Sequence, residues 1–158
     1  MLLFFRPSWQ VGIAQRHDEL FSNSKSDRRD GMISVFVYGT LLVGESNHGV
    51  VSPFMKHAEP GVIHGRLYDV GPYPALVRTE DNHQVVGEWL DVTEEGLIAM
   101  DELEMYYGPG HPNNEYERVW VKDVHNQREG WVYCWRSPRG LPEIQGSSWK
   151  AHRQSNGL

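Results

Sequence analysis

Apolar and polar residues alternate with a period of two along most of the chain from Met32 onward, and turn-forming residues separate the alternating segments. This alternation is typical of half-buried β-strands, in which successive side chains point to opposite faces. A turn over Gly71 to Pro74 precedes one short strand, and His125 to Gln127 joins two others into a hairpin. The pattern predicts strands over residues 33–38, 62–70, 75–77, 84–92, 116–124 and 130–135.

Two segments have helical rather than alternating patterns. Residues 47–55 predict a short helix. Thr93 is a suitable N-cap for a second helix that runs to about Glu104, because its hydroxyl can accept a hydrogen bond from a free backbone N–H of the first turn. The regular strand–helix alternation of a doubly wound parallel sheet is absent. The expected fold class is therefore α+β, as a small mixed β-barrel with flanking helices.

Composition narrows the class of protein. The chain has 158 residues, of which 39% are hydrophobic and 23% charged, which indicates one globular domain rather than a disordered chain. The net charge of -6 opposes a phosphate backbone, so nucleic acid is not an expected partner. No apolar run approaches the roughly 20 residues of a membrane span. A single cysteine, Cys134, excludes an intramolecular disulfide and fits the reducing cytoplasm.

Residues 1–31 differ from the remainder because they lack sustained periodicity and end in a polar stretch. Two interpretations are open. The segment is either a disordered N-terminal extension, or upstream sequence translated artificially before a natural start at Met32. The domain is expected over residues 32–158 in both cases.

Glu104 is the first candidate for chemistry. Each helical residue advances by about 100°, so Glu104 lies almost over Leu97 and close to Met100, on the apolar face of the predicted helix. Burial disfavours the charged form of a carboxyl group and raises its pKa, as a general acid or base near neutrality requires. Alternatively, Glu104 reaches solvent or pairs with Arg118. Asp101, Glu102 and Glu117 are expected to be solvated surface charges.

Other segments are less specific. The strand over residues 33–38 runs into a turn with Gly39 and Gly44, which is either an anion-binding turn or an ordinary one. Tyr133 shares one face of its strand with Trp131 and Trp135, so it lies in the core or faces a polar cavity. The histidines and the single cysteine form no metal-binding or nucleophile motif.

Four motifs in order resemble one known family. They are Val35 to Leu41 followed by Asn47 and His48, Gly87 to Val92, Met100 to Glu104, and Tyr116 to Arg118. Over residues 32 to about 149 the chain resembles the gamma-glutamylcyclotransferase-like, or AIG2-like, family. The resemblance implies a small mixed β-barrel whose cavity holds a small γ-glutamyl compound. In such enzymes the α-amine of the γ-glutamyl group attacks its own γ-carbonyl, releasing an amine and forming 5-oxoproline.

The resemblance also implies roles for individual residues. Glu104 is the expected acid/base, Tyr38, Gly39, Thr40 and Leu41 form the substrate loop, and Tyr133 lines the cavity. Neither a metal nor a cofactor is expected, and the oligomeric state is left open. Two alternatives remain, namely a non-catalytic small-ligand-binding or interaction module on the same barrel, and hydrolysis to free glutamate.

The chain departs from the family pattern directly after Glu104. The family often has glycine at the next position, where this chain has Met105, and a long turn-rich loop over residues 106–114 follows. This loop is expected to cover the mouth of the cavity.

Overall fold

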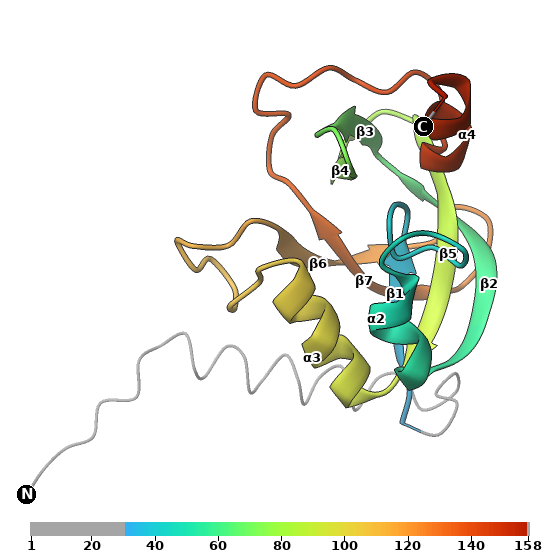
Figure 1. Cartoon of the computed structure of the whole chain (residues 1–158), viewed down its shortest axis with the longest axis vertical. Coiled ribbons are helices and arrows are strands. Elements are labelled where there is room, and N and C mark those ends of the chain that lie inside the picture. The colour runs from blue at the N-terminus through green and yellow to red at the C-terminus, as the bar shows by residue number, and fades with distance from the viewer. Residues whose placement is uncertain (1–30, 158) are drawn as a thin grey trace, which may run out of the picture. The chain divides into compact units, whose positions relative to one another are not determined.

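A mixed five-stranded sheet forms the centre of the protein in a computed structural model that describes residues 31–157. The residues from Met32 onward form one compact unit, whereas the predictions for residues 1–30 lie outside the described part. Neighbouring strands are antiparallel except β1 and β7, which run parallel (Figure 1). The strand order is β2 (Met55–His64), β5 (Gln84–Val92), β1 (Ile33–Val37), β7 (Glu129–Cys134), β6 (Glu117–Lys122).

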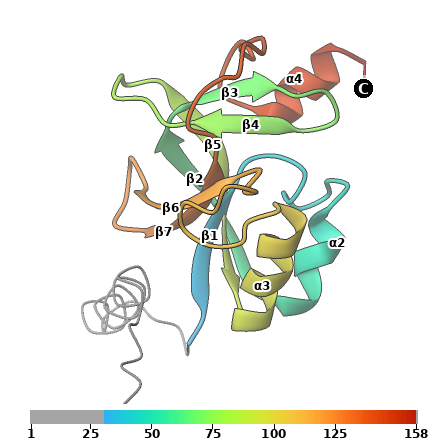
Figure 2. The same cartoon turned by 90° about the vertical axis from the view of Figure 1, so that its left-hand side faces the viewer.

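A second, two-stranded sheet lies at one end of the large one. It pairs β3 (Arg66–Asp69) with β4 (Pro74–Val77), and a bridge from Val77 to Trp135 connects it to the chain just after β7. The large sheet does not close, because β2 and β6 remain as its edges. The predicted α+β class is confirmed, and the expected barrel is realised only as an open, curved sheet with flanking elements (Figure 2).

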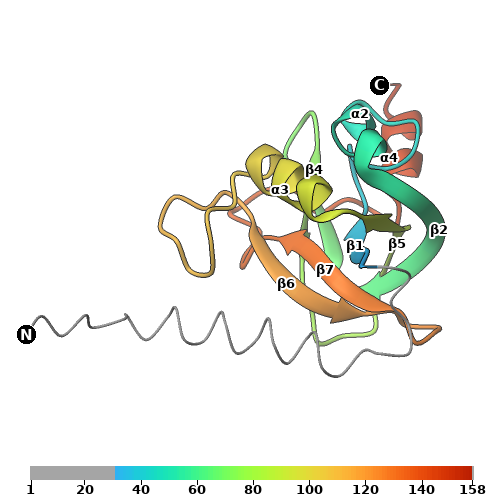
Figure 3. The same cartoon turned by 90° about the horizontal axis from the view of Figure 1, so that it is seen from below.

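Helices pack at both ends of the molecule. α2 (His48–Val51), with the 3₁₀ turn over Ser52–Phe54, lies beside α3 (Glu94–Leu103), and the β6–β7 hairpin lies next to α3 (Figure 3). The Thr93 hydroxyl accepts a hydrogen bond from the Gly96 N–H at 3.2 Å, as predicted for the N-cap of α3. None of the helices within residues 31–157 has the length and apolarity needed to span a membrane.

Two predicted boundaries are wrong. Residues 62–70 form parts of two strands, which separate at Gly65, where a Cβ atom would lie only 3.1 Å from the Val77 carbonyl oxygen. The predicted helix over residues 47–55 ends early and the chain is already extended at Met55. Pro53 explains this end, since it has no N–H to continue the helical hydrogen bonds.

Both faces of the large sheet are buried. Val35 and Val37 pack toward α2 and α3, in a cluster that includes Met100 and Tyr133, whereas Phe36 points the other way. Gly87 allows β5 to approach β1 closely, because a Cβ atom there would overlap the Val37 carbonyl oxygen. The first cluster covers the end of β1 from which the site is built. The second cluster contains Phe36, Tyr38, Ile63, Leu67, Leu76, Val85, Trp89, Val121, Val132, Cys134, Ile144 and Trp149.

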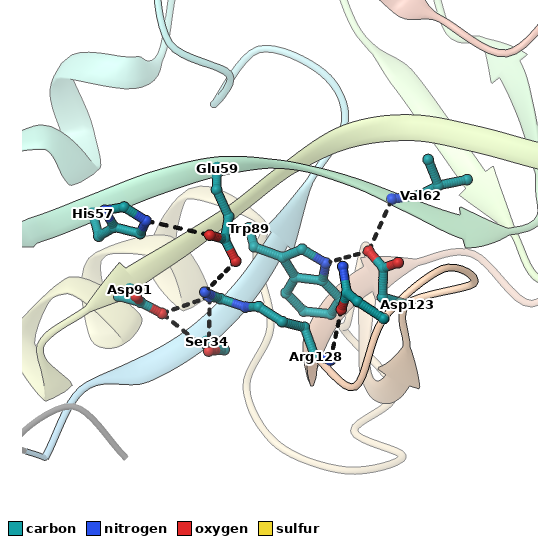
Figure 4. Close-up of polar contacts among 9 residues, drawn as sticks. Ser34, His57, Glu59, Val62, Trp89, Asp91, Asp123 and Arg128 are labelled. Atoms are coloured by element: carbon teal, nitrogen blue, oxygen red, sulfur yellow. Dashed lines mark hydrogen bonds and ion pairs between the residues drawn. The ribbon is translucent and has the colours of Figure 1, made fainter. Parts of the chain in front are cut away.

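A polar cluster fixes the β6–β7 turn to the sheet. Arg128 of this turn donates hydrogen bonds to Asp91 of β5 at 2.7 Å and to Glu59 of β2 at 2.6 Å (Figure 4). Its guanidinium also reaches the Ser34 hydroxyl of β1 at 3.2 Å. One cation therefore joins three neighbouring strands, away from the end of β1 where the turn after Val37 begins.

Candidate functional site

A cavity of about 150 Å³ opens where the turn after β1, the start of β4 and the end of α3 meet. The structure brings together all six residues singled out from the sequence, because Tyr38, Gly39, Thr40, Leu41, Glu104 and Tyr133 each line this cavity. The remaining lining residues are Val37, Asn47, Tyr73, Pro74, Leu103, Met105, Glu115 and Tyr116.

Glu104 stands at the C-terminal end of α3 and faces the cavity. Its backbone N–H donates to the Met100 carbonyl at 2.9 Å, and its own carbonyl accepts from the Tyr116 N–H at 3.3 Å, so the residue is fixed from both sides. Burial of the carboxyl group raises the pKa of Glu104 to about 7. Near neutral pH this group therefore exists in comparable amounts as acid and as carboxylate.

Arg118 does not neutralise Glu104. Its Nη1 instead lies 2.6 Å from an Asp101 carboxylate oxygen, and its guanidinium stacks between the rings of Tyr106 and Trp131, at 4.9 Å from each centroid. The suggested pairing of Arg118 with Glu104 is therefore wrong. The compensation of Arg118 by Asp101 leaves burial as the dominant influence on the pKa of Glu104.

The expectation that Asp101 is a solvated surface charge is also wrong. Asp101 precedes Glu104 by three residues, so the two share a face of α3. Its carboxylate accepts a hydrogen bond from the Tyr133 hydroxyl at 2.6 Å in addition to those from Arg118. Asp101 thus holds the Tyr133 ring, which lines the cavity, in one orientation.

Hydrogen bonds of Tyr38 and Asn47 hold the turn after β1 in place. The Tyr38 hydroxyl donates to the Tyr133 carbonyl at 2.6 Å and accepts from the Leu76 N–H at 3.2 Å. Asn47 anchors the turn by donating its backbone N–H to the Thr40 carbonyl at 2.8 Å and its side-chain amide to the Thr40 hydroxyl at 3.0 Å. Within residues 31–157, no hydrogen bond engages the backbone N–H of Thr40 or Leu41.

Glycine is required at the start of this turn. A Cβ atom on Gly39 would lie 2.8 Å from two ring carbons of Pro74, which is closer than side-chain carbons pack. The absence of a side chain at Gly39 lets the turn approach β4 and narrows the cavity. Gly39 is therefore needed so that the turn can pack closely against Pro74. The sequence alone did not show this close contact.

A helix that was not predicted from the sequence supports the site. α4 (Trp149–Ser155) lies against the turn after β1, where Lys150 donates to the Val43 carbonyl at 2.9 Å and Arg153 pairs with Glu45 at 3.2 Å. Ser148 caps this helix by accepting from the Ala151 N–H at 3.2 Å. A serine before Trp149 and basic residues in the last turn were the signals that could have revealed it.

The loop over residues 106–114 does not cover the cavity as expected. None of its residues lines the cavity, whereas the flanking residues Met105 and Glu115 do, and Met105 is 46% exposed at its rim. Gly110, His111 and Asn114 of the loop line a separate depression beside β7. The side chain of Asn114 folds the loop on itself by accepting from the Tyr107 N–H at 2.7 Å and donating to the Gly108 carbonyl at 2.7 Å.

Cys134 lies on the opposite face of β7 from Tyr133 and is buried. Burial raises the pKa of this thiol to about 11, so little thiolate is present near neutral pH. The prediction of a buried thiol is confirmed. The cavity of this α+β protein thus combines the buried carboxyl group of Glu104 with a turn that hydrogen bonds hold in place.

Residues 35–151 match the family described as gamma-glutamyl cyclotransferase, AIG2-like, and the chain belongs to this family. It is 38% identical over 125 residues to the gamma-L-glutamyl-butirosin B gamma-glutamyl cyclotransferase of Niallia circulans, which covers 77% of this chain and 78% of the relative. It is 34% identical over 89 residues to the gamma-glutamylaminecyclotransferase of Bos taurus, covering 49% of this chain and 52% of that protein. The protein is thus an enzyme of the gamma-glutamyl cyclotransferase type.

Solved structures show the same fold. A crystal structure of an AIG2-like protein from Mus musculus superposes with a TM-score of 0.57 at 24% identity, covering 74% of this chain and 88% of that one. An uncharacterized protein from Pyrococcus horikoshii gives a TM-score of 0.60 at 23% identity, covering 79% and 96%. The fold class and family expected from the sequence are confirmed.

Proposed function

We propose that this protein cyclises a γ-glutamyl amine or γ-glutamyl amino acid to 5-oxoproline and releases the amine, with Glu104 as general acid and base. The observation that carries the proposal is the Glu104 carboxyl group, which faces the cavity with a pKa raised to about 7 by burial. The names of the two relatives refer to gamma-L-glutamyl-butirosin B and to γ-glutamylamines, which supports a γ-glutamyl substrate.

The reaction needs one group that both accepts and returns a proton. The Glu104 carboxylate takes a proton from the α-ammonium group of the substrate, and the freed amine attacks the γ-carbonyl carbon. A new C–N bond closes the five-membered ring as electrons move to the carbonyl oxygen. When they return, the bond to the leaving nitrogen breaks as the protonated Glu104 gives its proton to that nitrogen. The ring nitrogen passes its second surplus proton to the released amine, which leaves as an ammonium ion, and Glu104 is again a carboxylate.

The cavity supplies the remaining catalytic effects. Folding the γ-glutamyl chain so that its amine meets its own carbonyl makes the attack intramolecular, and well-oriented reactions of this kind have effective molarities of about 10⁵ M or more. The N–H groups of Thr40 and Leu41, which donate no hydrogen bond to any residue of the described range 31–157, are suited to bind the α-carboxylate or the oxyanion that forms during attack. Tyr38 and Tyr133 shape the walls around the folded chain.

The proposal predicts equal amounts of two products. Incubation of the protein with γ-glutamyl methylamide, γ-glutamyl hexylamide and γ-glutamylalanine should release 5-oxoproline and the free amine or amino acid in a one-to-one ratio from at least one of them. Mass spectrometry measures both products directly. Release of free glutamate instead would establish hydrolysis, and binding of all three compounds without any product would establish a non-catalytic binding module.

A further inference from the structure

We propose that Met105 forms an apolar subsite for the leaving amine and thereby selects γ-glutamyl amides of apolar amines. This inference rests on the proposed function and adds the class of leaving group. It follows from three features of Met105, namely its backbone conformation, its exposure at the rim of the cavity, and its position next to Glu104.

The backbone of Met105 is in a conformation that favours glycine. Its φ angle is 49°, in the left-handed region. The Met105 N–H donates to the Glu102 carbonyl at 3.2 Å and the Tyr106 N–H to the Asp101 carbonyl at 2.9 Å, which is the hydrogen-bond pattern of a Schellman C-cap. At this position glycine has no steric cost and methionine has one. Strained non-glycine residues cluster at functional sites, so the methionine side chain calls for a functional reason.

The exposure of Met105 at the cavity indicates a role in ligand binding. The side chain of Met105 is 46% exposed, and all other residues that line the cavity are buried or partly buried. The exposed part of Met105 is apolar surface that the folded protein itself leaves in contact with water. At the rim of a cavity, it gains contacts when a ligand covers it.

The position of Glu104 places the leaving group near Met105. Glu104 and Met105 are adjacent in the chain, and both line the cavity. Glu104 must reach the leaving nitrogen to return its proton, so the substituent on this nitrogen begins beside Glu104. Met105 is the most exposed of the residues that line the cavity, so a substituent that extends from Glu104 toward solvent lies beside it.

The chemistry of the side chain indicates the class of amine. A methionine side chain is unbranched and polarisable, and it adapts to apolar groups of different shapes. Of the other residues at the rim, Glu115 is paired with Arg139 at 2.8 Å and does not offer a free charge. The subsite therefore suits alkyl and aryl amines better than small or strongly polar ones.

Two substrates that differ only in the leaving amine test this inference. The ratio of kcat/KM for γ-glutamyl hexylamide to that for γ-glutamyl methylamide is measured in wild type, Met105→Gly, Met105→Ala and Ile98→Ala. We expect wild type to prefer the hexylamide by about tenfold, which corresponds to burial of about two methylene groups. Both Met105 variants should bring the ratio near one, because neither side chain reaches the hexyl group.

The control measurements distinguish the loss of the Met105 side chain from an effect on backbone conformation or folding. Ile98 is an exposed apolar residue on the same helix that does not line the cavity, so Ile98→Ala should keep the wild-type ratio. Thermal unfolding of Met105→Gly should give a Tm equal to or above that of wild type, which shows that the loss of preference is not a loss of folding. An unchanged ratio in both Met105 variants, or a change in the glycine variant alone, would overturn the subsite. Failure of the wild type to cyclise either amide would instead overturn the proposed function.

Discussion

Glu104→Gln is expected to lower kcat/KM for 5-oxoproline formation by about 10³-fold, within the range that general acid and base groups contribute. Glutamine has nearly the same size, so it preserves the packing at the end of α3. It can neither accept the ammonium proton nor return one to the leaving nitrogen. The measurement is the initial rate of 5-oxoproline release at pH 8, where the wild-type carboxyl group is ionised.

The pH dependence follows from the raised pKa of Glu104. Below about pH 7 the carboxyl group is protonated and cannot accept a proton, so wild-type kcat/KM should rise with pH and level off above about 7. The residual activity of Glu104→Gln should lack this rise. Glu102→Gln is the matched control, because Glu102 is an exposed carboxylate on the same helix, and it should retain both the activity and the profile. Equal activity of the wild type and the Glu104 variant would contradict the assigned role.

Arg128→Ala is expected to destabilise the fold by about 3 kcal/mol, as is typical when one partner of a buried ion pair is removed. Asp91 is only 5% exposed and would lose the guanidinium that lies 2.7 Å away. Glu59 would lose the same partner, and the β6–β7 turn would lose its link to three strands. Urea unfolding followed by tryptophan fluorescence measures the free energy of unfolding.

A surface arginine provides the comparison. The side chain of Arg136 is 77% exposed and lies 3.4 Å from Glu117, so Arg136→Ala should change the free energy of unfolding by less than about 0.5 kcal/mol. A similar small change for Arg128→Ala would show that the cluster in Figure 4 contributes little to stability. The cluster lies apart from the cavity, so a loss of activity in the folded Arg128 variant is not expected.

Local patterns predicted the elements that build the cavity. The alternation over residues 84–92 gave the bounds of β5, and Thr93 capped α3 as expected. Helical geometry alone placed Glu104 on the inner face of α3, since residues seven apart in a helix lie on the same side. The strand bounds, the helix cap and the face of Glu104 depend only on residues that are close in the sequence. They can therefore be predicted from one sequence.

Features that depend on distant parts of the chain were not predictable in the same way. The partner of Arg118 is Asp101 rather than Glu104, and this choice depends on how β6 packs against α3. The break at Gly65 reflects the approach of Val77 from β4. α4 is short and is stabilised by the burial of Trp149 and by contacts with the turn after β1, more than by helical periodicity.

The conformation of Met105 illustrates a further limit. A glycine after Glu104 would have indicated a left-handed helix end, and methionine concealed it. Residues 106–114 were expected to cover the cavity because they form a long, turn-rich loop, but none of them lines it, whereas Met105 does.

The titration of the Glu104 carboxyl group tests the central claim most directly. ¹³C NMR of protein labelled at the glutamate side-chain carboxyl carbons, recorded from pH 4 to 9 for wild type and Glu104→Gln, identifies the Glu104 resonance by its absence in the variant. We expect this resonance to titrate with a pKa of about 7, because burial penalises the carboxylate. A pKa near the unperturbed value of 4.5 would contradict the claim that an enclosed, protonatable carboxyl group performs the chemistry.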